Sequence, residues 1–239
     1  MKEFLQSVQE NAAFLLTCLG IFAALVLVAW VFQRLLVKNR RAVSPARRVS
    51  YVAMFSAVAA LLMLIEIPLF FAPAFYKIDL SEIPVLICAF YLGPVAGVVT
   101  ELVKVLLKLL LKGTTTAFVG DFANFVVGCS LVLPATIIYH THKSRHSALI
   151  GLAVGCICMT VFGSAFNAVY LLPKFAQLYG LPLDTIIAMG TKINGNIHNV
   201  STFVLICVAP LNLIKSAAVS VLTLLLYKRV ARPLFGLRQ

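Results

Sequence analysis

The chain of 239 residues is 62% hydrophobic and only 12% charged, which makes it far more apolar than a soluble globular domain. Several uncharged stretches reach the roughly 20 residues that a helix needs to cross a bilayer. The sequence therefore predicts an all-α integral membrane protein. We attribute the net charge of +12 to membrane topology and anionic lipid, and not to nucleic-acid binding.

Seven transmembrane helices are expected along the chain. The first helix is long enough to span the membrane, and the segment before it lacks the positive charge typical of a signal peptide. We therefore interpret this helix as a retained anchor and not as a cleaved signal. Gly93-Pro94 interrupts a long apolar stretch, because proline disfavours helix at the preceding residue. The expected spans are 12–34, 49–69, 83–92, 94–112, 117–140, 147–172 and 198–227.

Lys and Arg predict the orientation of these helices. With the N-terminus outside, the inner segments 34–48, 140–147 and 228–239 hold twelve of the twenty Lys and Arg and none of the eight acidic residues. We therefore expect a multi-pass protein of the cell (plasma) membrane, with the N-terminus outside and the C-terminus in the cytoplasm.

The connection at 68–84 is too aromatic and proline-rich for a simple turn, and it contains Phe75, Tyr76 and Asp79. We expect this loop to fold back over a site on the outer side of the membrane. The same topology places four polar residues of the spans on that side: Asp121, Asn124, Asn167 and Lys215.

A charge inside a span often marks a substrate route, because burying it in lipid is costly. Lys215 is the clearest case, and the alternative is a structural ion pair with Asp121 or Glu101. Each Asn could likewise serve only to join neighbouring helices.

Charged residues also form a stripe along one helix, at Glu101, Lys104, Lys108 and Lys112. We favour a stripe that faces a neighbouring helix, with Glu101 pairing Lys104 and Lys112 at the outer interface. A conductive or anion-attracting stripe is the alternative, but an ion channel would leave the aromatic loop without a purpose.

Several function classes lack support in the sequence. No nucleotide-binding P-loop and no hydrolase motif occurs, so neither ATP hydrolysis nor hydrolase chemistry is expected. The six Cys all fall in apolar spans, without metal-ligand spacing. No metal, no cofactor and no enzymatic activity is predicted.

An ordered set of short motifs resembles one family, the riboflavin-specific substrate-binding (S) components of energy-coupling factor (ECF) transporters. The resemblance covers about residues 49–232. The motifs are KIDLSEIP at 77–84, YLGPVAG at 91–97, LVK at 102–104, GDFANF at 120–125, NAVYLLP at 167–173 and PLNLIK at 210–215.

The resemblance implies a six-helix S-component core, which we place at 49–232. The additional N-terminal transmembrane helix with a basic cytoplasmic linker at 1–48 is not part of that core, and a cytoplasmic tail is expected at 233–239. It also implies an outward-facing flavin pocket capped by the 68–84 loop. Asn167 and Lys215 would hold the polar edge of the flavin. Residues of the cap would enclose the ring, and the implied cap residues are Phe75, Tyr76, Asp79 and Leu80. Asp121 and Asn124 would touch the ligand or support the pocket.

Ala53 and Ala57 match the small residues with which this family docks on a transmembrane scaffold subunit, which in turn couples to two ATPase subunits. One departure lies in the cap, which reads Asp79-Leu-Ser-Glu82 where the family pattern has Asp-Phe-Ser-Asp. The alternatives left open are an S component for another vitamin or precursor, riboflavin phosphate as the ligand, and a membrane assembly protein without a ligand.

Overall fold

The structure is a computed structural model that describes residues 12–36, 43–73, 75–114, 116 and 118–235. Much of the expected basic linker (37–42) and the end of the expected tail (236–239) lie outside these residues. The helices are α2 (Ala12–Leu36), α3 (Pro45–Leu64), α4 (Glu82–Leu92), α5 (Pro94–Lys112), α6 (Val119–His142), α7 (Arg145–Phe166), α8 (Leu172–Tyr179), α9 (Leu183–Thr191), α10 (Val200–Phe203) and α11 (Ala209–Phe235).

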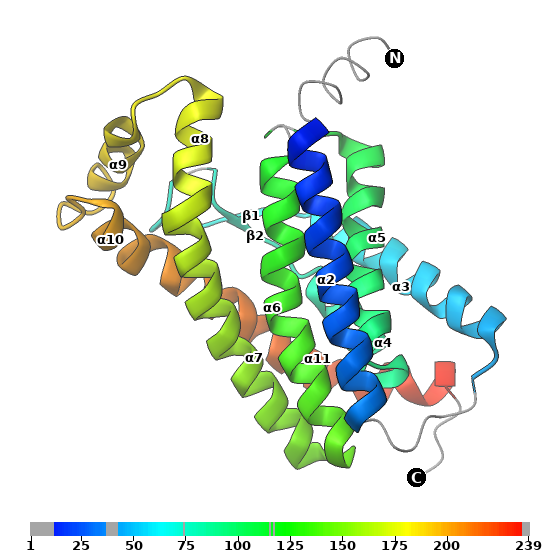
Figure 1. The fold of residues 1–239 in the computed structure, drawn as a ribbon. Coiled ribbons are helices and arrows are strands. Elements are labelled where there is room, and N and C mark those ends of the chain that lie inside the picture. The colour runs from blue at the N-terminus through cyan, green and yellow to red at the C-terminus, as the bar shows by residue number, and fades with distance from the viewer. Residues whose placement is uncertain (1–11, 37–42, 74, 115, 117, 236–239) are drawn as a thin grey trace.

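The described residues form a helical bundle, as expected for this composition (Figure 1). Five helices are long and apolar enough to cross a membrane, beginning at Leu16, Pro45, Val119, Arg145 and Val200. Helix α4 is apolar but short, and α5 carries the charged stripe. The structure thus confirms a helical membrane protein, whereas the division into six core helices and one additional helix stays a prediction.

The predicted break between α4 and α5 is confirmed. Helix α4 ends at Leu92 and α5 begins at Pro94, and Gly93 between them has a φ of 108°. A side chain is strained in this region, so glycine suits the turn. The turn lets α4 and α5 pack on each other as separate helices.

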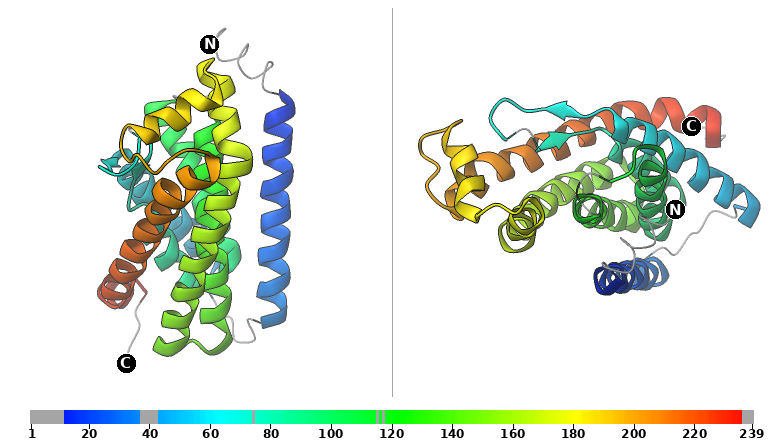
Figure 2. Two further views of the ribbon diagram at one scale, coloured as in Figure 1. Left: turned by 90° about the vertical axis from the view of Figure 1, so that its left-hand side faces the viewer. Right: turned by 90° about the horizontal axis from the view of Figure 1, so that it is seen from above.

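Helix α2 lies along the outside of the bundle, where it packs on α5 and α6 (Figure 2). Most of its apolar surface is exposed, including Leu19 and Leu27. By contrast, α4 is almost wholly buried between α3, α5, α6 and α11. The central position of α4 accounts for the high apolarity of its short sequence.

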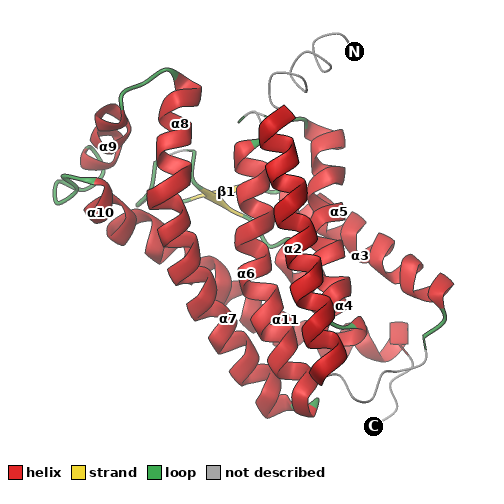
Figure 3. Ribbon diagram, in the orientation of Figure 1, coloured by secondary structure: helices red, strands yellow, loops and turns green. Residues whose placement is uncertain are grey.

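Two short strands stand at one end of the bundle, β1 (Ile67–Pro68) and β2 (Lys77–Ile78), which pair antiparallel with Ile67 opposite Ile78 (Figure 3). They belong to the connection between α3 and α4, the segment predicted to be a loop. π-helical turns precede α8, at Asn167–Leu171, and α11, at Val204–Val208. Such turns are frequent at functional sites, because they redirect side chains within a helix.

Candidate functional site

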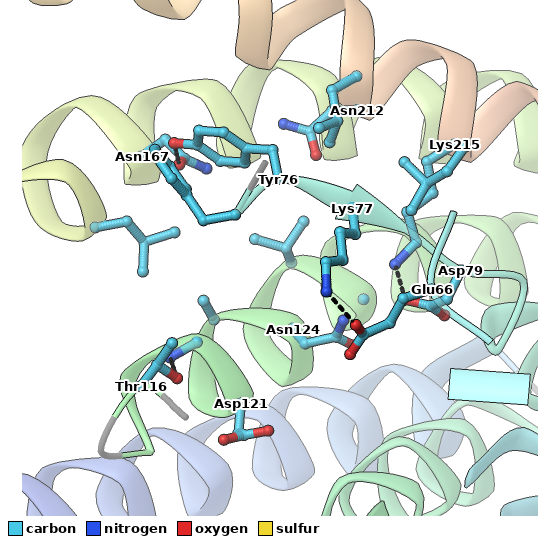
Figure 4. Close-up of a pocket in the computed structure, with 18 of the residues that line it drawn as sticks. Glu66, Tyr76, Lys77, Asp79, Thr116, Asp121, Asn124, Asn167, Asn212 and Lys215 are labelled. Atoms are coloured by element: carbon cyan, nitrogen blue, oxygen red, sulfur yellow. Dashed lines mark hydrogen bonds and ion pairs between the residues drawn. The ribbon is translucent and has the colours of Figure 1, made fainter. Parts of the chain in front are cut away.

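A cavity of about 310 Å³ opens at the end of the bundle where β1 and β2 lie (Figure 4). Its wall combines the α3–α4 connection with side chains of α5, α6, α7, α11 and the π-helical turn before α8. The charged and amide residues on the wall are Glu66, Lys77, Asp79, Lys108, Asp121, Asn124, Asn167, Asn212 and Lys215.

Most of the predicted site residues meet in this cavity. Asn124 and Asp121 reach it from the first turns of α6, on one helix face as expected, and Phe75, Tyr76 and Asp79 reach it from the connection. Asn167 and Lys215 complete the group from the opposite side (Figure 4). Leu80 is not on the wall and packs instead against the hydrophobic core cluster formed mainly by α4 and α6.

The α3–α4 connection, residues 65–81, is held against the bundle by specific bonds. The Tyr76 hydroxyl donates to Asn167 Oδ1 at 2.6 Å, and the Cys207 thiol donates to the carbonyl of Phe71 at 3.2 Å. Burial raises the pKa of Tyr76, so its hydroxyl stays a donor at neutral pH. These bonds hold the connection against the π-helical turns before α8 and α11, whereas its role as a cap over a ligand stays a prediction.

Lys215 is buried and lies between two carboxylates. Its Nζ is 3.1 Å from Asp79 Oδ2 and 3.0 Å from Glu82 Oε1. The suggested pairing with Asp121 or Glu101 was wrong, because Asp121 pairs with Lys108 at 2.6 Å and Glu101 pairs with Lys104. Sequence reasoning missed these partners because Asp79 comes from the connection, 136 residues away.

Opposite charges hold Asp79 ionised. Burial by itself raises the pKa of Asp79, but the ammonium groups of Lys215 and Lys104 and hydrogen bonds from Ser81 lower it to about 2. The cavity wall carries three carboxylates and three lysines in total, so its formal charges balance.

The interpretation of the α5 stripe as a face towards neighbouring helices is confirmed. Glu101 and Lys104 are fully buried and pair with each other, and Lys108 contacts Asp121 of α6. Lys112, further out and 42% exposed in its side chain, pairs with Glu66 at 2.7 Å. Each lysine of the stripe therefore has a carboxylate partner.

Several polar atoms on the wall are buried without a hydrogen-bond partner among the described residues. They include Asn212 Nδ2 and Asn124 Oδ1. Asn212 was not predicted, although it lies three residues before Lys215 and thus on the same helix face. Buried polar groups normally find partners, so these atoms point to a polar ligand.

A family model described as the ECF transporter, substrate-specific component, matches residues 47–227. The chain belongs to this family. As a member of this family, the chain is a substrate-specific component of a membrane transporter, and the family is not enzymatic.

Named relatives agree with that assignment. Riboflavin transporter RibU of Staphylococcus aureus (strain TCH60) is 35% identical over 185 residues, which cover 77% of this chain and 90% of the relative. Riboflavin transporter FmnP of Bacillus subtilis (strain 168) is 28% identical over 182 residues, which cover 76% and 90%. A solved structure of the S component of a bacterial ECF transporter matches with a TM-score of 0.63 and 36% identity, over 80% of this chain and 99% of that one.

Proposed function

We propose that this substrate-specific component captures riboflavin from outside the cell in the cavity described above. The observation that carries the proposal is the set of unpaired polar atoms on a wall that combines apolar and polar side chains, in a chain whose relatives are named riboflavin transporters. A flavin has the matching chemistry, a wide apolar ring with a hydrogen-bonding edge. A cavity of about 310 Å³ is also in the range of small-molecule sites, roughly 300–1,000 Å³.

Donors and acceptors remain free at the cavity wall for the polar edge of the ring. A lysine ammonium has three N–H donors. Two of those of Lys215 can be used by the contacts with Asp79 and Glu82, which leaves one for a ligand. Asn212 Nδ2 offers further donors, and Asn124 Oδ1 offers an acceptor. Such a wall would provide hydrogen-bond partners for both the carbonyl oxygens and the imide N–H of the flavin. If these flavin groups were buried without partners, the binding affinity would be lower.

The α3–α4 connection would act as the cap. Phe75 and Tyr76 would enclose the ring, and Asp79 would hold the cap to α11 through Lys215. The Tyr76 hydroxyl donates to Asn167 Oδ1, so a flavin would share this acceptor with Tyr76 or displace its hydroxyl. Leu80 would support the cap from the core and not contact the ligand.

The balanced charge of the cavity favours riboflavin over its phosphate. Lys77 and Lys108 each have a carboxylate partner, Glu66 and Asp121 respectively. A phosphate group carries close to two negative charges and would have to displace one of these carboxylates. The phosphate is therefore expected to bind more weakly than the neutral vitamin.

As the family resemblance implies, transport would require a transmembrane scaffold subunit and two ATPase subunits; this chain itself contains no nucleotide-binding P-loop motif. Ala53 and Ala57 lie exposed on α3, beside the exposed Val58 and Leu61. Small residues allow close approach of another helix, which supports this face as the docking surface. In the proposed topology the cavity lies on the outer side, with the N-terminus outside and the C-terminus in the cytoplasm.

A thermal-shift panel on the purified protein tests the ligand. Riboflavin should raise the unfolding temperature at low micromolar concentration, riboflavin phosphate should do so only at higher concentration, and thiamine and biotin should have no effect. Stabilisation by another vitamin alone would identify a different S component. No stabilisation by any compound would favour a membrane assembly protein.

A further inference from the structure

Five charged side chains, two on the cavity wall and three behind it, form a continuous buried network of alternating sign. Asp79 contacts Lys215 at 3.1 Å, and Lys215 contacts Glu82 at 3.0 Å. Glu82 Oε1 also contacts Lys104 at 3.3 Å, and Lys104 contacts Glu101 Oε1 at 2.6 Å. None of the five residues is more than 7% exposed. The network joins the connection, α4, α5 and α11.

The charges of this network do not balance when every group is ionised. Three carboxylates face two ammonium groups, which leaves one negative charge in excess. An uncompensated charge is very costly in a buried site, and such a site commonly neutralises itself by taking up or releasing a proton. One bound proton would make the network electrically neutral.

The contacts of the three carboxylates differ, and they indicate which one holds the proton. Asp79 has Lys215 and the backbone N–H of Ser81, and Glu82 Oε1 receives both lysines. Glu101 has one lysine, shared with Glu82, and its Oε2 is buried without a hydrogen-bond partner among the described residues. Ionisation is therefore least favourable at Glu101.

Among the described residues, Lys104 is the only positive group within ion-pair distance of Glu101. The titratable groups facing it are Lys104 on its own helix, Glu82 on α4, Lys215 on α11 and the Cys129 thiol on α6. The described residues also contain no group of three or more His, Cys, Asp or Glu that could hold a metal ion. A proton is thus the ligand that this geometry accommodates.

We propose that Glu101 is a proton-binding site and that it carries a neutral carboxylic acid at neutral pH. The proton adds to Glu101 Oε2 from solvent, without any other bond change. The neutral network lets Lys215 keep its charge at the cavity wall. The protonation of Glu101 does not require a bound flavin, so its test is independent of the proposed riboflavin binding.

Infrared spectroscopy of the purified protein in detergent tests the proposal. A protonated carboxylic acid has a carbonyl stretch above the amide I band, which a carboxylate lacks. The wild type should show this band at neutral pH, and Glu101→Gln should remove it. Because glutamine mimics the neutral acid, this variant should shift the unfolding temperature by no more than about 2 °C.

Two matched variants complete the experiment. Glu66→Gln changes a partly exposed carboxylate outside the network and should keep the band. Glu82→Gln removes one negative charge from the network, so Glu101 should ionise to restore neutrality and the band should disappear although Glu101 is present. Absence of the band in the wild type, its persistence in Glu101→Gln, or its persistence in Glu82→Gln would overturn the proposal.

Discussion

The Tyr76 hydroxyl donates a 2.6 Å hydrogen bond to Asn167 Oδ1, and this bond ties the α3–α4 connection to the π-helical turn after α7. The Asn167 amide also donates to the carbonyl of Gly163 at 3.0 Å, which holds its orientation. The connection and the far wall of the cavity are therefore linked through one side chain. Ligand entry should depend on how easily this link opens.

Tyr76→Phe should accelerate riboflavin association. A neutral hydrogen bond contributes about 0.5–1.5 kcal/mol, so its loss should raise the open population up to about tenfold, while the ring that would cover the flavin is kept. Stopped-flow quenching of riboflavin fluorescence measures the association rate. An unchanged or slower rate would show that this bond does not limit entry.

Asn212→Leu and Lys215→Met should separate binding from stability. Asn212→Leu removes a buried amide whose Nδ2 has no partner among the described residues, so stability should be retained while riboflavin affinity falls at least about tenfold. Lys215→Met leaves Asp79 and Glu82 without this cation and should cost about 3–5 kcal/mol of stability as well as affinity. Thermal unfolding and equilibrium titration of both variants provide the comparison. Equal loss of stability in the two variants would contradict the assigned roles.

Gly128→Ala should destabilise the fold. A Cβ at this position would lie 1.9 Å from Glu101 Oε1, within a network that cannot shift freely. Overpacking of this kind costs about 1–3 kcal/mol, measurable by thermal unfolding in detergent. Gly20→Ala is the control, because a Cβ there meets nothing within 4 Å. If both variants were as stable as the wild type, the packing around Glu101 would be looser than described.

Ala53→Trp and Ala57→Trp should leave riboflavin binding intact and stop uptake by cells. Both positions are exposed on α3, so the larger side chain should obstruct only a docked partner. Val161→Trp on α7, at a residue that is 65% exposed, is the matched control for added bulk and should not affect uptake. Normal uptake by the α3 variants would remove the docking assignment.

Long apolar stretches and helix-breaking residues made the main helices predictable from the sequence, including the break at Gly93-Pro94. Helix periodicity likewise placed Asp121 and Asn124 on one face. The partners of Lys215 could not be predicted, because they depend on how the connection folds against α11. Asn212 could have been found from its spacing to Lys215, whereas the packing of Leu80 into the core required the folded structure.

The most direct test of the account is a fluorescence titration of purified protein with riboflavin. The cavity should bind one riboflavin per chain and quench its fluorescence, and Asn167→Ala should weaken binding by at least about 1–3 kcal/mol through the lost polar contact. A flat titration of the wild type at micromolar protein would contradict the central claim.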